Sequence, residues 1–389
     1  MATASGFPVL WKEEHYLWKV TLPGVGHSSP IVWGRRVFIT SAVDGGGKRL
    51  VLCYNADTGE LRWSRVLPLP PGPRHRKNSH ATATPATDGK RVFVSFSSAS
   101  DYVLAAYSMD GELLWKRDLG PFVGQHGSGT SPIVYGGMVV LANHQDGESF
   151  VVAYDAATGA ERWKLPRPGG EQMASYSTPV VLNRPGKPDL LVFLCRSRGL
   201  YAVDPNSGEE VWYTGPFPFR TVASPVVAGT VVVGTSGSGG QGKYLAVYDG
   251  ASQGALSEAD ALWTRTRQIP YVPTPVVYNG LLFLWNDQGV VSCVEPRTGR
   301  RYWIARVTGA DGRPAVYSSS PIVVNGYIYC PSERGDVAVL RASQEYELVG
   351  HCPLGEDVYA TPAVARGRMY IRTTRSLICV GSLATVGKR

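Results

Sequence analysis

The sequence has few charges and no long apolar run. Only 18% of its 389 residues are charged, and the mean hydropathy is −0.09. A disordered chain needs low hydrophobicity and high charge, and a coiled coil needs about half its residues as strong helix formers, so both classes are excluded. No stretch reaches the roughly 18 apolar residues of a membrane-spanning helix. The 45 glycines and 28 prolines instead indicate many tight turns.

Motifs for redox, metal or nucleotide chemistry are also missing. The six cysteines form neither a CxxC motif nor an adjacent pair, and we interpret them as small buried hydrophobic residues. There is no HExxH motif, no GxSxG elbow and no EF-hand loop. The glycine-rich run 237–243 imitates a phosphate-binding loop, but Tyr244 follows it and the chain continues into a predicted strand at 245–248. A phosphate-binding loop must open a helix, so we reject that interpretation.

Positive charge is in excess but is not concentrated. The net charge is +8 and the isoelectric point is about 9.1, yet the only dense basic run is Arg74-His75-Arg76-Lys77. A nucleic-acid-binding protein usually gathers such charge on one face, with aromatic residues between. We therefore expect no nucleic-acid partner.

An internal repeat dominates the chain. A Ser-Pro or Thr-Pro dipeptide followed by a short apolar run occurs eight times, in units that begin near residues 28, 83, 130, 177, 223, 273, 319 and 360. In the first unit, strands are expected at 30–33, 37–40, 50–54 and 61–63, with a tight turn at Asp57-Thr58-Gly59. Eight equal units of four short strands predict an all-β, eight-bladed propeller of four-stranded antiparallel blades, built as a single domain over 1–389.

The two ends of the chain are expected to close the ring. The unit at Pro362 supplies three strands before the sequence stops, and 16–22 near the N-terminus reads as the missing fourth strand of the last blade. Pairing these segments leaves no open sheet edge.

A tryptophan recurs in the fourth strand of most units. Because a large ring can fill the wedge between two blades, we predict a structural docking role for these residues rather than ligand contact. The seventh unit lacks the tryptophan and its turn, with 345–348 in their place. The docking residues are Trp18, Trp63, Trp115, Trp163, Trp212, Trp263 and Trp303.

The repeat unit resembles a known family. The pattern Asp155…Thr158-Gly159…Trp163, with a Ser-Pro strand upstream, is similar to the tryptophan-docking repeat of PQQ-like, quinoprotein-type and BamB-like β-propeller proteins, of the kind abundant in Planctomycetes. Further local matches lie at 22–34, 77–81 and 126–132, and the resemblance covers essentially the whole chain. It implies the eight-bladed fold, while a fold alone does not carry a function.

The resemblance also implies a location. Such chains are usually preceded by an export signal, whereas residues 1–5 have neither the basic nor the apolar region of one. We therefore expect an exported protein of the periplasm or cell envelope, whose signal is absent from this chain.

The candidate site is the mouth of the central channel, where the loops that enter each first strand converge. Three interpretations remain open: His27, His80 and His126 bind a divalent metal; the ring of polar side chains binds a sugar or peptide, with tyrosines as stacking surfaces; or the histidines only fill the funnel. The unequal offsets of the three histidines from their prolines count against the metal. The candidate residues are His27, Asn78, His80, Gln125, His126, Tyr176, Arg220, Tyr271, Tyr317, Asp357 and Tyr359.

Other loops are expected to place charged side chains and a lid segment near the channel mouth. Four carboxylates are expected there, but no pair has a fixed spacing, so we assign no catalysis. The basic insertion 66–77 is expected to form a lid over the channel. The insertion 251–261 is expected on the opposite face, as an ornament or partner contact. The carboxylates are Asp146, Glu148, Asp287 and Glu333.

The expected function is a noncatalytic ligand- or protein-binding scaffold of the bacterial cell envelope, BamB-like and monomeric. Its partner would be a protein segment or a glycan at the channel mouth, with no cofactor. The alternative is an enzyme that uses the funnel, such as a metal-assisted lyase or hydrolase acting on carbohydrate. A PQQ-dependent dehydrogenase is less expected, because the resemblance implies for those enzymes a longer propeller, calcium and an adjacent-cysteine disulfide, and no adjacent cysteines occur here.

Overall fold

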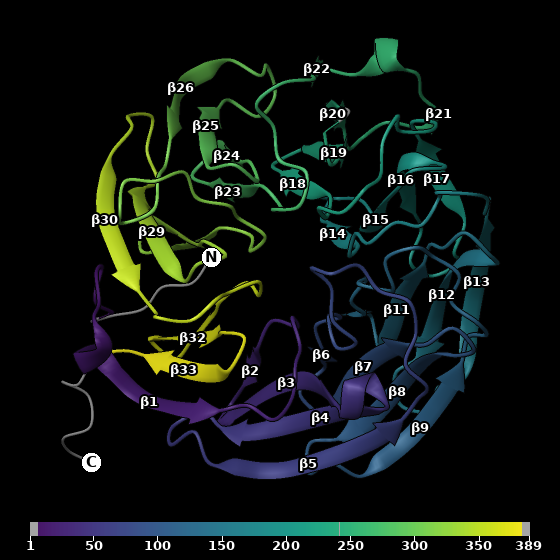
Figure 1. The fold of residues 1–389 in the computed structure, drawn as a ribbon. Helices are drawn as coiled ribbons and strands as arrows, with labels where there is room; N and C mark the ends of the chain where they lie inside the picture. Colours follow the sequence, from purple (N-terminus) through teal and green to yellow (C-terminus); the bar gives the residue numbers. More distant parts are fainter. Residues whose placement is uncertain (1–6, 241, 383–389) are drawn as a thin grey trace.

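The fold is an all-β propeller of eight blades, as predicted. The computed structural model describes residues 7–240 and 242–382, which form 33 strands and three single-turn 3₁₀ helices, η1 (Glu13–His15), η2 (Asp44–Gly46) and η3 (Glu258–Asp260). Figure 1 shows eight sheets in a ring, with the first strand of each blade toward the centre and the last at the rim. Within the described ranges, no helix has the length and apolar character needed to cross a bilayer.

The first four blades follow the chain from the N-terminal side, and each is antiparallel in the order inner to outer strand. Blade 1 is β2 (Ile31–Trp33), β3 (Arg36–Val43), β4 (Lys48–Asn55) and β5 (Leu61–Pro68). Blade 2 is β6 (Ala86–Thr87), β7 (Arg91–Ser97), β8 (Tyr102–Ser108) and β9 (Leu113–Asp118). Blade 3 is β10 (Ile133–Tyr135), β11 (Met138–Asn143), β12 (Ser149–Asp155) and β13 (Glu161–Arg167). Blade 4 is β14 (Val180–Leu182), β15 (Leu190–Cys195), β16 (Gly199–Val203) and β17 (Glu210–Tyr213).

The second four blades complete the ring. Blade 5 is β18 (Val226–Ala228), β19 (Val231–Ser238), β20 (Gly242–Asp249) and β22 (Trp263–Arg265). Blade 6 is β23 (Val276–Tyr278), β24 (Leu281–Trp285), β25 (Val290–Val294) and β26 (Arg301–Arg306). Blade 7 is β27 (Ile322–Val324), β28 (Tyr327–Pro331), β29 (Asp336–Arg341) and β30 (Leu348–Pro353). Blade 8 is β31 (Ala363–Ala365), β32 (Arg368–Arg372), β33 (Ser376–Val380) and β1 (Tyr16–Thr21).

The two middle strands of each blade carry the core. β3 and β4 are buried along nearly their whole length, because neighbouring blades cover both faces of the sheet. Such strands read as continuous apolar runs, whereas the outer β5 is largely exposed. All six cysteines lie buried as free thiols.

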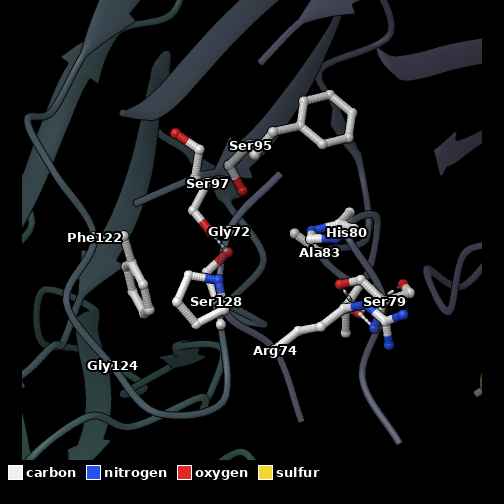
Figure 2. Close-up of a pocket in the computed structure, with 15 residues that line it drawn as sticks. Gly72, Arg74, Ser79, His80, Ala83, Ser95, Ser97, Phe122, Gly124 and Ser128 are labelled. Atoms are coloured by element: carbon white, nitrogen blue, oxygen red, sulfur yellow. Dashed lines mark hydrogen bonds between the residues drawn. The ribbon is translucent and has the colours of Figure 1, made fainter. Parts of the chain in front are cut away.

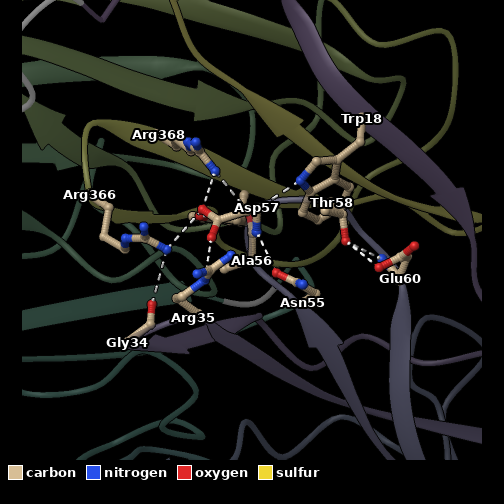
Figure 3. Close-up of polar contacts among 11 residues, drawn as sticks. Trp18, Gly34, Arg35, Asn55, Ala56, Asp57, Thr58, Glu60, Arg366 and Arg368 are labelled. Carbon is tan, nitrogen blue, oxygen red and sulfur yellow. Dashed lines mark hydrogen bonds and ion pairs between the residues drawn. The ribbon is translucent and has the colours of Figure 1, made fainter. Parts of the chain in front are cut away.

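The ring closes where the sequence predicted. β1 pairs antiparallel with β33, and Trp18 lies opposite Cys379. At this seam the carboxylate of Asp57 in blade 1 binds Arg366 at 2.9 Å and Arg368 at 2.8 Å from blade 8, as well as Arg35 at 2.7 Å (Figure 3). Hydrogen bonding and charge therefore join the two ends of the chain.

The Ser/Thr-Pro dipeptides form a closed belt around the channel, which we call the hydroxyl belt. The backbone N–H of each hydroxyl residue donates to the side-chain oxygen of the corresponding residue in the next blade, over 2.9–3.2 Å. Serine and threonine alternate around the ring. The members are Ser29, Thr84, Ser131, Thr178, Ser224, Thr274, Ser320 and Thr361.

Six of the repeated tryptophans donate their indole N–H to a backbone carbonyl in the next blade. Trp18 donates to Ala56 and Trp163 to Pro205, at 3.2 and 2.8 Å, and the rings of Trp63, Trp115, Trp263 and Trp303 make the same bond. In the turn of that next blade, Gly59 (φ +75°) lies so close to the Trp18 ring that a Cβ atom would overlap it. These six indole rings therefore link neighbouring blades.

Trp212 departs from this pattern because of the insertion 251–261. A short strand from it, β21 (Gly254–Ala255), pairs in parallel with β17 at Trp212 and Tyr213. Trp212 is completely buried, and its indole N–H has no partner among the described residues. The insertion is therefore a fifth strand that covers the outer edge of blade 4.

Blade 7, which lacks the repeated tryptophan, is completed by the N-terminal segment. Gly350 occupies the strand position that tryptophan has elsewhere, and Leu10 packs against it. Trp11 is 2% exposed, stacks on Tyr329 at 5.5 Å and donates its backbone N–H to the Cys352 sulfur. An aromatic ring from outside the repeat thus fills this seam.

Candidate functional site

The loops that enter the inner strands surround a cavity of about 980 Å³ at the centre of the ring. Eight of the eleven predicted residues line it: His27, Asn78, His126, Tyr176, Arg220, Tyr271, Tyr317 and Tyr359. Gln125 and Asp357 are exposed and are not among its lining residues, and His80 lines a different cavity. The convergence of loops predicted most of the wall.

The loop that carries His126 is held in place by its neighbour. The side-chain amide of Asn78 donates to the carbonyl of His126 at 2.7 Å, and the backbone N–H of His75 donates to the same oxygen at 3.2 Å. The rings of His75 and His126 meet edge to face at 5.0 Å. Asn78 therefore uses its donors to fix the loop.

His126 in turn contacts Arg220. Nη1 of Arg220 lies 2.7 Å from Nε2 of His126. A guanidinium can only donate, so Nε2 must be the acceptor and the imidazole is neutral. Burial and the adjacent Arg220 charge lower the pKa of His126, which agrees with a neutral ring.

His27 lies at the entry to blade 1, where its ring stacks on Tyr359 at 4.6 Å. Its backbone N–H donates to the carbonyl of Ala81 and to the hydroxyl of Ser79. Burial, reinforced by the charge of Arg372, lowers the pKa of His27 to about 4. His27 is thus a neutral stacking partner.

His80 does not join the other two histidines. It lines a separate cavity of about 20 Å³, which is large enough for about one water molecule. Figure 2 shows His80 there with Arg74, Ser79 and Ala83. Burial, with the charges of Arg49 and Arg74, lowers its pKa to about 4. Across the described residues, no three His, Cys, Asp or Glu side chains are placed to hold a metal ion. The structure therefore does not bring His27, His80 and His126 together as a metal site.

The basic insertion reaches across the channel mouth. His75, Arg76 and Lys77 line the cavity, and the Lys77 ammonium binds Glu333 of blade 7 at 2.8 Å. Glu333 also accepts a hydrogen bond from Ser318 at 2.6 Å. The predicted lid segment is therefore tied by an ion pair to the far side of the funnel, a contact that its composition did not indicate.

A second ion pair joins blades 5 and 6. Lys243, from the glycine-rich run dismissed as a phosphate loop, binds Asp287, which also accepts the backbone N–H groups of Tyr271 and Val272. In the described part of this run, Gly237 and Ser238 end β19 and Gly242 and Lys243 begin β20, so the run continues strands and does not open a helix. Of the other predicted carboxylates, Asp146 accepts the N–H of Ala174 and Glu148 pairs with Lys164, and neither is among the residues that line the cavity.

The described residues of the wall give it a polar and aromatic character. Its two carboxylates are paired with lysines, the imidazoles of His27 and His126 are neutral, and its tyrosines supply hydroxyl groups and ring faces. A general acid must give a proton to the substrate, and a general base must accept one from it. A carboxylate that is ion-paired with an ammonium group is poorly suited to both roles. The geometry is that of a polar, aromatic and net basic binding cavity.

Comparison with known proteins places the chain in a family. The sequence model described as "Outer membrane protein assembly factor BamB" matches residues 12–187, 48–305 and 196–388. A protein of that name from Moranella endobia (strain PCIT) is 26% identical over 227 residues, which span 55% of this chain and 54% of the relative. The match thus covers about half the length of that curated relative.

Two solved structures share the fold and differ in function. BamB from Moraxella catarrhalis has a TM-score of 0.67 at 14% identity, over 96% of this chain and 99% of that one. A europium-containing methanol dehydrogenase has a TM-score of 0.68 at 12% identity, over 92% and 84%. At such identities the likeness shows the fold alone. The family match spans nearly the whole sequence, and the chain belongs to the BamB family of PQQ-like β-propeller proteins.

Proposed function

We propose that this protein is a noncatalytic binding scaffold of the bacterial cell envelope, which holds a protein segment in the central funnel. The observation that carries the proposal is the pairing within the wall: Lys77 with Glu333 and Lys243 with Asp287. These pairs leave hydroxyl groups, ring faces and two arginines, Arg76 and Arg220, as the groups that face a ligand. The name of its relatives, an outer membrane protein assembly factor, supports the envelope location and a protein partner.

The enzymatic alternatives have less support. A metal-assisted lyase or hydrolase was expected to use His27, His80 and His126, which lie in two separate cavities. A quinone held over calcium does not fit either, because both carboxylates of the cavity are paired with lysines and all six cysteines are buried free thiols. Among the described residues, neither the metal nor the quinone with calcium has a matching set of ligands.

Photo-cross-linking in the native cell tests the proposal. A photoreactive amino acid replaces Tyr271 or Tyr359 in the funnel, or Tyr346, which is 39% exposed near the outer strand of blade 7, as the control. We expect the two funnel positions to give the same discrete set of envelope-protein adducts and Tyr346 to give none of them. Identical adducts at all three positions, or none from the funnel, would overturn the proposal.

A further inference from the structure

Arg220 has no carboxylate partner among the described residues. Four cationic side chains and two carboxylates line the cavity, and both carboxylates are taken by Lys77 and Lys243. Arg76 is exposed to solvent, whereas Arg220 is partly buried. Within 7–240 and 242–382, no carboxylate lies within ion-pair distance of the Arg220 guanidinium. A partly buried charge of this kind is ordinarily paired.

Hydrogen bonds of its backbone and of its side chain hold Arg220 in place. The carbonyl of Arg220 accepts the N–H of Gly237 at 2.9 Å, in an isolated bridge between the entry loop and β19. Nη1 is engaged by His126. The Tyr271 hydroxyl accepts a further hydrogen bond from this guanidinium. The Nε–H is buried and has no partner among the described residues, so this donor is left to offer.

A second unused donor lies beside it. The hydroxyl of Tyr176 is also buried without a partner in the described structure. The backbone N–H of Tyr176 donates to the carbonyl of Thr221, the residue after Arg220, at 3.0 Å. On the other side, Tyr271 is joined to the same loop by the N–H of Ala223 at 3.2 Å. Three successive entry loops thus bring one charge and two phenols together.

We infer that Arg220 and Tyr176 bind a carboxylate of the protein segment that enters the funnel, so that the preferred segment is acidic. The inference rests on the proposed function and names its ligand. The guanidinium matches a carboxylate in charge, its Nε–H can donate one hydrogen bond, and the Tyr176 phenol adds a second donor. A neutral segment or an uncharged sugar would leave the Arg220 charge unpaired and is therefore disfavoured.

Binding of short blocked peptides tests the inference. Tetraglutamate is titrated into the full chain at low ionic strength, with tetraglutamine as the neutral probe. Calorimetry gives the affinity, and the ¹⁵N signal of the Arg220 Nε–H group, assigned by its loss in Arg220→Gln, locates the contact. We expect saturable binding of tetraglutamate with a dissociation constant of about 1 mM or tighter and no saturable binding of tetraglutamine.

Variants separate Arg220 from the general basic charge. Arg220→Gln should weaken tetraglutamate binding about tenfold or more, because it removes a charged hydrogen-bond donor, and Tyr176→Phe should weaken it about threefold. Arg198→Gln is the matched control: Arg198 already binds Glu210, so the affinity should not change. Thermal melts check that each variant is folded.

Each other outcome overturns the inference. Equal binding by Arg220→Gln and the wild type would place the carboxylate elsewhere, and no saturable shift at about 10 mM tetraglutamate would mean that Arg220 takes no carboxylate. An Arg220 signal that responds to inorganic phosphate but not to tetraglutamate would replace the peptide by a phosphate ligand. In all three cases cross-linking at Tyr271 and Tyr359 can still succeed, so failure of this inference and failure of the scaffold function are distinguishable.

Discussion

The backbone N–H of Thr361 donates to the hydroxyl of Ser29 at 3.0 Å, although 332 residues separate them in the sequence. This bond is the last link of the hydroxyl belt and joins blade 8 to blade 1. The Ser/Thr hydroxyl of the repeated dipeptide therefore has a structural role, because it accepts the equivalent hydrogen bond between each neighbouring pair of blades. The proline that follows cannot donate a backbone hydrogen bond of its own, and it leads into the inner strand.

Removing one hydroxyl from the belt should weaken the ring at one seam. Ser29→Ala leaves the Thr361 N–H without its acceptor, and we expect the free energy of unfolding to fall by about 1 kcal/mol in urea denaturation. Ser29→Thr is the control, because threonine holds the same position in four blades, and it should stay close to the wild type. If the alanine variant is as stable as the threonine variant, the belt does not stabilise the closure.

Trp11 should behave as a core residue although it lies outside the repeats. Its ring is 2% exposed, and Trp11→Ala would leave a cavity beside Tyr329 that costs about 3–5 kcal/mol of stability. Trp33→Ala, at a ring that is 50% exposed, should cost less than about 1 kcal/mol. Denaturation midpoints measure both. Similar losses for the two variants would contradict the view that the N-terminal segment completes blade 7.

Asp57 should contribute more to closure than the equivalent residue at the next seam. Burial alone would raise the pKa of Asp57, but Arg366, Arg368 and Arg35 outweigh it and lower that pKa, so the carboxylate is ionised and shared by three cations (Figure 3). Asp57→Asn should cost about 1–3 kcal/mol, and less at high salt.

Asp110→Asn provides the comparison at the seam between blades 1 and 2. The Asp110 side chain is 82% exposed and, among the described residues, its carboxylate pairs with Arg36 alone, so its loss should change stability by at most about 0.5 kcal/mol. The test is to measure the free energies of unfolding of both variants at low and at high salt. Equal and salt-independent effects of the two substitutions would show that the cluster at Asp57 adds nothing to closure.

The sequence was sufficient to predict the blades because each blade contains its own signals. Every unit begins with a Ser/Thr-Pro dipeptide and most end with a turn and a tryptophan, so strand number and order follow from local chemistry. The role of Trp11 could not be predicted, since nothing near it repeats. The fifth strand β21 was missed for a similar reason: its pairing with β17 depends on where the insertion folds back.

The candidate site was predicted by position but not by contact. Convergence of the entry loops correctly indicated eight lining residues, since strand starts fix where those loops lie. It failed for Gln125 and Asp357, which are exposed, and for His80, which lines a neighbouring small cavity. The pairing of Lys77 with Glu333 could not be predicted from the sequence, because packing and not sequence spacing sets the direction of a long side chain from a loop.

Acid should destabilise the protein through buried histidines, and His144 gives the sharpest case. It is 2% exposed, and its Nε2 lies 2.7 Å from the hydroxyl of Tyr201. Burial, with the charge of Arg167, lowers its pKa to about 3, whereas a histidine in the unfolded chain titrates near about 6.5. Between these values the unfolded chain binds a proton that the folded chain does not. Stability therefore falls with decreasing pH across this window, by up to about 1.4 kcal/mol per pH unit for this group.

Urea denaturation from about pH 7 to about pH 5 measures that slope. His144→Gln should reduce the slope by the contribution of one proton, while His27, His80 and His126, whose pKa values are also lowered by burial, still contribute to it. Tyr201→Phe is the matched variant: it removes the hydrogen bond but leaves the imidazole buried, so it should lower stability at every pH and keep the wild-type slope. Because the two substitutions affect the same contact, only proton binding distinguishes them. A wild-type slope in His144→Gln would show that this buried histidine is not a source of acid sensitivity.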